Sequence, residues 1–413
     1  MQSSQENPQS TTSSSTSDIL PSLNAELGHS LLKYYSLDSN YINTNNGSYG
    51  TTPRYVQEAK QKYLDEFEAR PDIFLAHIHA PYFKERQRII SQYVDADPED
   101  LVFVQNATEA NACILNSINY QPGDIILMYD FVYNAVKSHC NSLVDKFQVV
   151  LVAMETNQKM LSSKEALVKL AQEHIEKYGN KIKIAIIDYL SSMPCVLVPV
   201  EELVPLFRKH GILALVDGAH VFNQLDFSLR KLDPDFFHCN IHKWAPMPKG
   251  LNFLYVKKEL QSMIHPTILS RGFKQGFFAE FVRLGTRDFS NIYCVKESME
   301  FIERLGGRRR INDYCSNLAV KVGQRVKEIW KTELLVEEKE NVPFMVNVIL
   351  PYQQDDALEK LNLNKVFEHA KTILQLAKYK DIWYVRFSCN VYNELSDYES
   401  VAKTVLEILE GRI

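Results

Sequence analysis

The chain alternates short apolar runs with longer helical patterns, and this alternation constrains its fold more than any other feature. The runs read LVFV (101–104), IILM (125–128), VVLVAM (149–154), IKIAIID (182–188) and ILALVD (212–217). Strands that alternate with helices pair in parallel through right-handed crossovers. Because each run is almost continuously apolar, its strand should be covered on both faces. The pattern therefore predicts an α/β fold with a mostly parallel central sheet and helices on both of its faces.

Two further runs extend this sheet. DFFHCNI (235–241) and NFLYVK (252–257) bracket a turn-rich segment, which predicts an antiparallel hairpin that closes the sheet. Residues 54–70 and 163–178 place apolar side chains at helical spacing. We expect these elements, together with an N-terminal segment, to form one large domain over residues 21–289.

The pattern changes from about residue 290. A helix is expected over 310–333, strands over 344–350 and 383–389, and a terminal helix after residue 395. These elements predict a smaller α+β domain that covers residues 290–413.

The beginning of the chain is rich in Ser, Thr and Gln and almost free of apolar side chains. Such a segment cannot bury enough surface to offset its conformational entropy, so residues 1–20 are predicted to form a disordered tail. Residues 1–18 contain no apolar core and no arginine, which disfavours a secretory or mitochondrial signal. No run of about 18 apolar residues occurs elsewhere. We expect a cytoplasmic protein that does not cross a membrane.

Charge and cysteine content argue against several other classes of protein. The 46 basic and 51 acidic residues give a net charge of −5, and without a basic stripe nucleic acid is not an expected partner. The seven cysteines are scattered and form no C-x-x-C pair, which favours reduced thiols over a disulfide framework. The eleven histidines show no zinc-ligand spacing, so no metal site is expected.

Polar or ionisable side chains follow three predicted strands, at the edge where open α/β sheets bind ligands. Asn106, Ala107 and Thr108 follow LVFV and open a helix, whose free N–H groups suit a phosphate. Asp217 ends ILALVD, where a buried carboxylate needs a cation such as a protonated pyridine. Lys243 follows DFFHCNI, where desolvation favours the neutral amine that Schiff-base chemistry requires. Taken singly, these could be a helix cap, a capping aspartate and a surface lysine, but together they predict one cofactor site.

The chain resembles the class V aminotransferases, a branch of the fold-type I pyridoxal-phosphate enzymes, from about Tyr41 to its C-terminus. Within this class it is similar to isopenicillin N epimerase-like proteins, and especially to the fungal hercynylcysteine sulfoxide lyases of ergothioneine biosynthesis. The DGAH and HKW elements are specific for the class, and ARPD and SSMP narrow it further. The stretches that carry the resemblance are NNGSYGTTPR (45–54), ARPDIF (69–74), VFVQNATEA (102–110), SSMPCVLVPVEEL (191–203), LDPDFFHCNIHKW (232–244) and GTRDFSNIY (285–293).

The resemblance implies that the cofactor is pyridoxal 5'-phosphate, and it gives matching residues a role. Lys243 would carry the cofactor as a Schiff base and move the Cα proton of the substrate. Asp217 would pair with the pyridine nitrogen, and His220 would help to hold the ring. The phosphate would be bound by Ala107, Thr108, Asn240 and His242.

Further matches concern the substrate and a second subunit. Tyr133 would stack on the cofactor and could act as an acid toward a leaving group, and Ser192 would hydrogen-bond the phenolic oxygen of the cofactor. Arg386 matches the arginine that grips the α-carboxylate of an amino-acid substrate as a bidentate fork. Gly285 and Thr286 match a loop that reaches the phosphate of a neighbouring subunit, so the resemblance implies a homodimer.

Four sites depart from the family pattern. Tyr189 stands where many relatives carry histidine, Cys195 where lyase-like sequences have glycine, and Arg283 where relatives often have an apolar or aromatic residue. The segment from His77 to His79 also differs. All four could line the substrate side of the site, and the alternative for the two histidines is a structural role with satisfied hydrogen bonds.

The resemblance implies cleavage of a C–S bond in an amino acid held by Arg386, with release of pyruvate and ammonia. An epimerase remains an alternative. It needs a second base facing Lys243, for which Tyr189 or a histidine of residues 77–79 is the candidate. A transaminase is another alternative. A non-catalytic dimer that binds the cofactor is a further one. A desulfurase needs a nucleophilic cysteine upstream of the arginine, and the interval from Ser316 to Val385 contains none.

Overall fold

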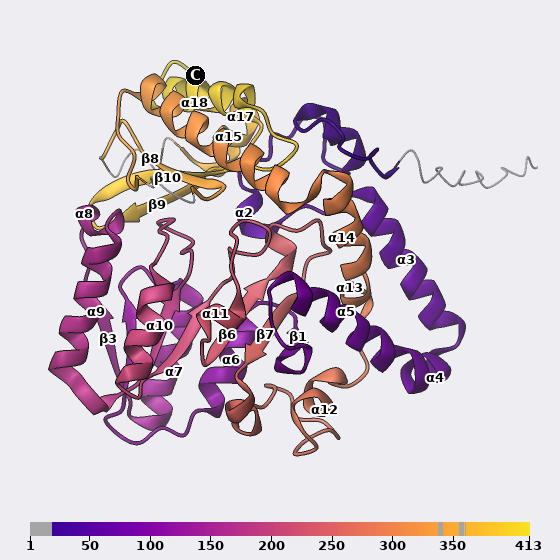
Figure 1. Cartoon of the computed structure of the whole chain (residues 1–413). Helices are drawn as coiled ribbons and strands as arrows, with labels where there is room; N and C mark the ends of the chain where they lie inside the picture. The colour runs from indigo at the N-terminus through magenta and orange to yellow at the C-terminus, as the bar shows by residue number, and fades with distance from the viewer. Residues whose placement is uncertain (1–18, 338–341, 355–358, 360) are drawn as a thin grey trace, which may run out of the picture.

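The computed structural model describes residues 19–337, 342–354, 359 and 361–413. Residues 1–18 of the predicted disordered tail lie outside these ranges. The chain forms a larger part around a broad sheet and a smaller part that stacks on one end of it, drawn in orange to yellow (Figure 1).

The larger part is built around a seven-stranded sheet with the order β1–β7–β6–β5–β4–β2–β3. The pairs β2–β3, β2–β4, β4–β5 and β5–β6 are parallel, and β7 is antiparallel to both β1 and β6. The predicted α/β fold, its mostly parallel sheet and the closing hairpin are therefore confirmed. The strands are β1 (Leu101–Val104), β2 (Ile125–Tyr129), β3 (Val150–Met154), β4 (Ile182–Asp188), β5 (Leu213–Asp217), β6 (Phe236–Asn240) and β7 (Asn252–Val256).

Helices cover both faces of this sheet. The connections from β1 to β2 to β3 run one way across the sheet, and those from β3 to β4 to β5 run back. Because each crossover is right-handed, α6 and α7 lie on one face and α9 and α10 on the other (Figure 1). The long helices are α3 (Arg54–Ala69), α5 (His79–Tyr93), α6 (Ala107–Ser117), α7 (Asn134–Phe147), α9 (Lys164–Tyr178) and α10 (Val200–Lys209). Shorter ones are α4 (Pro71–Ile73), α8 (Gln158–Leu161), α11 (Leu229–Leu232) and α12 (Phe277–Val282).

The smaller part is a three-stranded antiparallel sheet with the order β8–β10–β9, packed against helices. It has its own buried cluster, which includes Leu318, Val385 and Val405. Among the residues of this part that the structure describes, the sequence predicted all the elements except β9 and α17. The elements are α15 (Gly307–Trp330), β8 (Met345–Ile349), α17 (Leu363–Ala370), β9 (Gln375–Tyr379), β10 (Ile382–Ser388) and α18 (Leu395–Leu409).

Two helices connect the parts. α13 (Ser290–Tyr293) and α14 (Val295–Arg304) pack against α3 and α5 of the larger part. The buried cluster of the larger part includes Ile311 and Cys315, and that of the smaller part begins at Leu318. The domain boundary at residue 290 stays a prediction.

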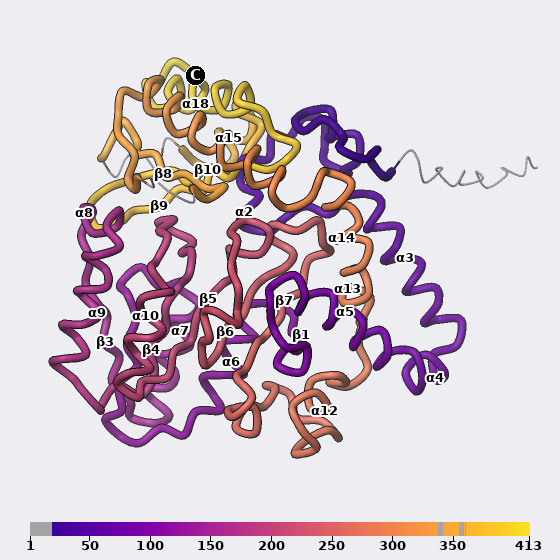
Figure 2. Tube along the Cα trace, viewed as in Figure 1, coloured from indigo at the N-terminus to yellow at the C-terminus, as the bar shows by residue number. Residues whose placement is uncertain are grey.

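The segment ahead of α3 runs between the two sheets (Figure 2). The amide of Ser388 in β10 donates to the carbonyl of Thr44 at 2.8 Å, and the short helix α2 (Asn46–Tyr49) packs on the turn that carries Lys243. Gly50 has φ +68, and a Cβ there would come 1.7 Å from the carbonyl oxygen of His242. Glycine is thus required where this segment crosses the larger sheet.

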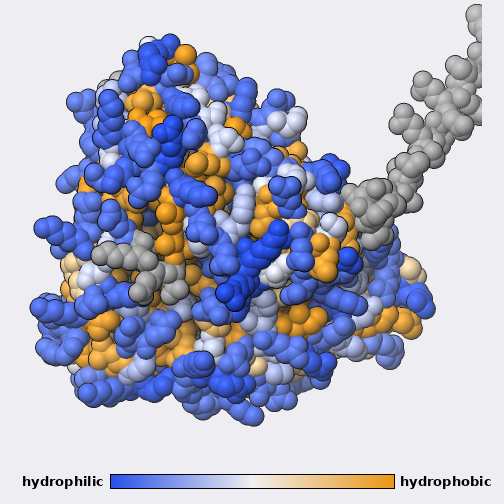
Figure 3. Space-filling view, turned by 45° about the horizontal axis from the view of Figure 1, so that its top comes forward, coloured by the Kyte–Doolittle hydropathy of each residue, from blue (hydrophilic) through white to orange (hydrophobic). Residues whose placement is uncertain are grey.

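The face of the molecule shown in Figure 3 is mostly hydrophilic, with apolar side chains in separate patches. Within the described ranges, no helix combines the length and the apolar character that a membrane crossing requires.

Candidate active site

Lys243 lies just past β6, in a 3-10 turn that spans Ile241–Lys243. Its Nζ is 3.0 Å from Nε2 of His220, which follows β5. Burial, assisted by the positive charge of Arg386, lowers the pKa of Lys243 to about 8. A larger share of this amine is therefore neutral near pH 7 than in an exposed lysine, as condensation with an aldehyde requires.

His220 is buried between Lys243 and Trp244. Burial, followed by the charge of Lys243, keeps the pKa of His220 well below its ordinary value, so the ring is neutral. The indole Nε1 of Trp244 is 3.4 Å from Nδ1 of His220. Because an indole N–H can only donate, Nδ1 is the acceptor and the ring hydrogen lies on Nε2. His220 thus presents a donor to the unprotonated amine of Lys243.

Asp217 ends β5 and is 4% exposed. Its Oδ1 accepts from the amide of Ala219 at 2.9 Å, and Nδ2 of Asn111 in α6 lies 3.4 Å from Oδ2. Nε2 of His238 lies 3.6 Å from the same Oδ2. In the part of the chain that the structure describes, no lysine or arginine forms an ion pair with Asp217. A buried carboxylate of this kind can take a cation, and the protonated nitrogen of a pyridine fits that need.

The first turn of α6 meets the end of β6. Asn106 caps the helix by accepting from the amide of Glu109 at 2.9 Å, and the amide of Ala107 donates to Oδ1 of Asn240 at 2.9 Å. Thr108 follows in the same turn and is exposed. The structure thus brings Ala107 and Asn240 together at a helix N-terminus, where an anion is favoured.

His242 lies beside this corner. Its Nδ1 is 2.8 Å from the carbonyl oxygen of Leu251, and burial lowers its pKa to about 4. The ring is therefore neutral near pH 7, and with its single N–H on Nδ1 directed at this carbonyl it adds no positive charge to the corner.

Arg386 is fully buried in β10 and bonds neutral groups. Its Nη1 donates to the carbonyl and hydroxyl oxygens of Ser192 at 3.1 and 3.0 Å. Its Nη2 donates to Oδ1 of Asn45 at 2.9 Å and to Oγ of Ser48 at 3.0 Å. Burial lowers the pKa of Arg386 to about 10, and its Nε has no hydrogen-bond partner within the described ranges. The guanidinium is held rigidly and remains available to an anion.

Lys243 and Arg386 line one cavity of about 270 Å³. Tyr133, just before α7, and Ser192 also line it, so four residues predicted from the sequence meet here. Tyr133 is 51% exposed. The remaining lining residues are Ser48, Tyr49, Val132, Asn134, Met193 and Gln375.

Three residues of this site were missed in the sequence. Asn45 and Ser48 hold Arg386, and Gln375 in turn accepts hydrogen bonds from both, at 3.2 and 3.3 Å. Ser48 lies in α2 and Asn45 just before it, whereas Gln375 lies in β9, more than 300 positions further along the chain. The run NNGSYG, which contributes to the family resemblance, was the available signal for Asn45 and Ser48.

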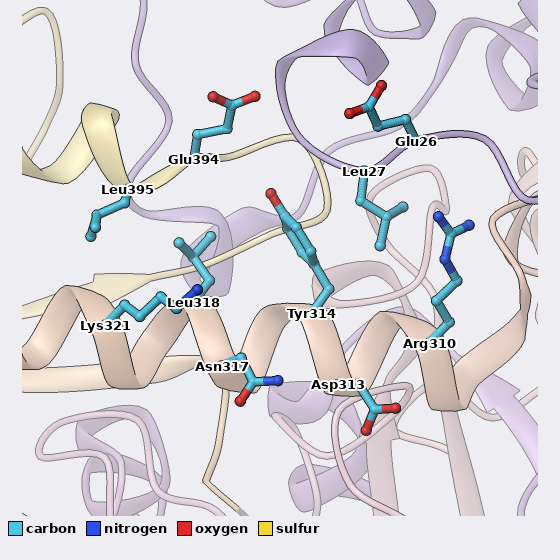
Figure 4. A pocket seen from close by; sticks show the side chains of 10 residues that line it. All are labelled: Glu26, Leu27, Arg310, Asp313, Tyr314, Asn317, Leu318, Lys321, Glu394 and Leu395. Atoms are coloured by element: carbon cyan, nitrogen blue, oxygen red, sulfur yellow. The ribbon is translucent and has the colours of Figure 1, made fainter.

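A larger cavity, of about 630 Å³, lies on α15 near the start of α18 (Figure 4). Tyr314, Lys321 and Glu394 line it, and none of the predicted site residues does. Size alone therefore does not identify the site.

The residues that depart from the family pattern lie elsewhere. Oη of Tyr189 donates to Glu201. The ring of His79 is 2.6 Å from Oη of Tyr293 and 2.5 Å from the carbonyl oxygen of Val282, so its structural role is confirmed. Tyr189 and His79, which could have lined the substrate side, are absent from the lining of the cavity, and hydrogen bonds hold both rings in other parts of the fold.

The other departures also lie outside the cavity lining. His77 is exposed and Arg283 is partly buried after α12, whereas Cys195 is buried and its amide donates to Asn347 at 3.2 Å. Gly285 and Thr286 are exposed on the loop after Arg283. Their contact with a neighbouring subunit stays a prediction.

Comparison with known proteins gives a consistent result. The family model "Aminotransferase class-V" matches residues 45–399. The chain is 30% identical over 397 residues to hercynylcysteine sulfoxide lyase of Schizosaccharomyces pombe, covering 92% of this chain and 97% of the relative. It is 29% identical over 401 residues to L-cysteine desulfhydrase of Arabidopsis thaliana, covering 89% and 88%. The cystine C–S lyase C-DES, solved with its product cysteine persulfide, has the same fold, with a TM-score of 0.75, 17% identity and coverage of 90% and 98%.

Proposed function

Because the chain belongs to the class-V aminotransferase family, we propose that it breaks the Cβ–S bond of a cysteine-derived amino acid. It is a pyridoxal-phosphate enzyme, and its similarity to C–S lyases and desulfhydrases supports the reaction type. The observation that carries the proposal is that the amine of Lys243 and the guanidinium of Arg386 line the same cavity. Hercynylcysteine sulfoxide is the proposed substrate, on the strength of the relative from S. pombe.

The residues present fit pyridoxal phosphate. Asp217 is a buried carboxylate that forms no ion pair with a lysine or arginine among the described residues, Lys243 is an amine of lowered pKa, and Ala107 opens a helix. We propose that they hold the ring nitrogen, the aldehyde carbon and the phosphate, respectively. When bound, the cofactor supplies an aldehyde that condenses with amines and a cationic ring that accepts electrons.

Side chains of the cavity bind the substrate and move its protons. Arg386 binds the α-carboxylate through its planar fork and so orients Cα toward Lys243. The neutral amine of Lys243 accepts the Cα proton. The Cβ–S bond then breaks with its electron pair on sulfur, and the hydroxyl of Tyr133 protonates the leaving group, which departs as a sulfenic acid from a sulfoxide or as a thiol or sulfide from other cysteine derivatives. Hydrolysis with water releases pyruvate and ammonia from the remaining three carbons.

The epimerase alternative needs a second base on the opposite side of Cα. The candidates from the sequence were Tyr189 and a histidine of residues 77–79. The cavity lining contains none of them, which favours the lyase over the epimerase. Tyr133 has a different task in the proposed mechanism.

A coupled assay tests this function. Purified protein is supplied with pyridoxal phosphate and either hercynylcysteine sulfoxide or cysteine, and pyruvate is followed with lactate dehydrogenase. We expect pyruvate from the sulfoxide, with a higher kcat/KM than from cysteine. If pyruvate fails to form while the amino acid loses its optical activity, the protein is an epimerase.

A further inference from the structure

Three ionisable side chains lie side by side at the ends of adjacent strands. Asp188 of β4 pairs in register with Asp217 of β5, and Asp217 pairs in register with His238 of β6. Residues in register on neighbouring parallel strands point to the same face of the sheet. All three are buried, at 4%, 4% and 0% exposure. We call Asp188, Asp217 and His238 the carboxylate row.

The first member of the row has no part in the reaction derived above. Burial, followed by the negative charge of Asp217, raises the pKa of Asp188 well above its ordinary value. Two buried carboxylates that are neighbours in register repel each other, which favours a proton on one of them. Asp217 accepts hydrogen bonds from the amide of Ala219 and from Asn111, so both of its oxygens already serve as acceptors. The proton therefore belongs on Asp188.

The third member is a histidine whose two ring nitrogens have no hydrogen-bond partner within the described ranges. Burial lowers the pKa of His238, so the ring is neutral. A buried polar group without a partner is costly and calls for an explanation. Its Nε2 is 3.6 Å from Oδ2 of Asp217, and a small movement would make an N–H donor there. A neutral ring can support the carboxylate without cancelling its charge.

The other ionisable groups that act on the row are Lys243, from the turn after β6, and the buried thiol of Cys239 in β6. Lys243 is the side chain that condenses with the cofactor. Once Lys243 has condensed, it is no longer a free ammonium ion. The cation that Asp217 would then face is the cofactor ring.

We propose that Asp188 and His238 are positioning residues that keep the single negative charge of the row on Asp217. Asp188 holds the proton of the row, and His238 flanks Asp217 as a neutral donor. The pyridine nitrogen of the cofactor consequently meets one ionised carboxylate, which keeps that nitrogen protonated. The proposal rests on the cofactor and on the fold, and it is independent of which substrate is cleaved.

Two measurements on the apoprotein and its complex test the row. The first is the infrared band of a buried carboxylic acid, assigned with isotope-labelled aspartate in the apoprotein at neutral pH. We expect the band in the wild type and its loss in Asp188→Asn. A wild type without the band, or an Asp188→Asn protein that keeps it, overturns the proposal. Because the wild-type spectrum needs no substitution, this arm stands even if a variant fails to fold.

The second measurement is the dissociation constant of pyridoxal phosphate. The amide of Asp188→Asn imitates a neutral acid, so we expect its Kd within about threefold of the wild type. Asp217→Asn removes the charge and should raise the Kd by more than about tenfold. His238→Phe should raise it about twofold to tenfold, the worth of one hydrogen bond, and His238→Gln should restore part of the loss.

The outcomes separate this proposal from the proposed function. If Asp188→Asn weakens cofactor binding as much as Asp217→Asn does, Asp188 is ionised, and the proposal that it holds a proton is wrong whatever the substrate is. If His238→Phe and His238→Gln bind the cofactor as the wild type does, the donor role of His238 is wrong. If the protein shows the infrared band and these dissociation constants but forms no pyruvate, the proposed lyase function is refuted and the proposal for the carboxylate row is supported.

Discussion

Replacing Arg386 with glutamine tests the carboxylate site at its centre. The buried guanidinium bonds neutral groups of Asn45, Ser48 and Ser192, so a substrate carboxylate would meet an uncompensated positive charge. Removing one partner of a buried charge pair costs about 3–5 kcal/mol. Since about 1.4 kcal/mol corresponds to a tenfold change in rate, kcat/KM should fall about 150- to 5,000-fold.

A second substitution separates charge from geometry. Arg386→Lys keeps the charge but loses the planar fork, which is worth about 1.5–3 kcal/mol for a hydrogen bond to a charged group. The fall in kcat/KM should therefore be about 10- to 150-fold. Arg283→Gln is the matched control, because this arginine lies outside the cavity lining. We expect it to change kcat/KM less than about threefold.

The assay compares a cysteine sulfoxide with its α-carboxamide. The wild type should prefer the carboxylate, and Arg386→Gln should lose most of that preference while still binding the cofactor on Lys243. If Arg386→Gln slows both compounds equally, or keeps the preference, then Arg386 does not bind the carboxylate.

Three further predictions follow from the same geometry. Because the pKa of Lys243 is lowered to about 8, the neutral fraction of its amine grows as pH rises through 8. The rate at which pyridoxal phosphate attaches to the apoprotein, measured by absorbance, should therefore increase up to about pH 8 and then level off. A rate that keeps rising to pH 10 would contradict this. Tyr133→Phe should lower pyruvate formation about 100-fold or more, since general acids contribute about 10²–10⁴, while its half-exposed position keeps the free energy of unfolding within about 0.5 kcal/mol. His79→Phe leaves the hydroxyl of Tyr293 and the carbonyl of Val282 without their hydrogen-bond partner. It should lower the free energy of unfolding, measured by urea titration, by about 1–3 kcal/mol and leave kcat/KM of the folded enzyme unchanged. A loss of kcat/KM would show that His79 contributes to the substrate site.

Local pattern was enough to predict the framework of the fold. The apolar runs of β1, β2, β4 and β7 are buried on both faces and leave little choice other than a covered sheet. Because parallel strands end at a common edge, the positions of Asp217 and Lys243 after two such strands are enough to place them together. β9 was missed because its sequence, QLAKY, lies half-exposed at the edge of the small sheet and carries no apolar run.

Contacts between distant segments could not be predicted in the same way. The support of Arg386 by Asn45 joins positions 341 apart, and nothing in either stretch encodes the pairing. Tyr189 follows a predicted strand directly, yet its ring turns to Glu201 in α10. The alignment of Asp188 with His238 depends on the register of β4, β5 and β6, which periodicity does not fix. The homodimer and the cytoplasmic location stay predictions.

The central claim is that Lys243 carries the cofactor. Protein treated with pyridoxal phosphate is reduced with borohydride, digested and mapped by mass spectrometry. The structure predicts a pyridoxyl group on Lys243, absent from the same peptide of the Lys243→Ala protein. A label on another lysine such as the exposed Lys249, or no label at all, would contradict the account.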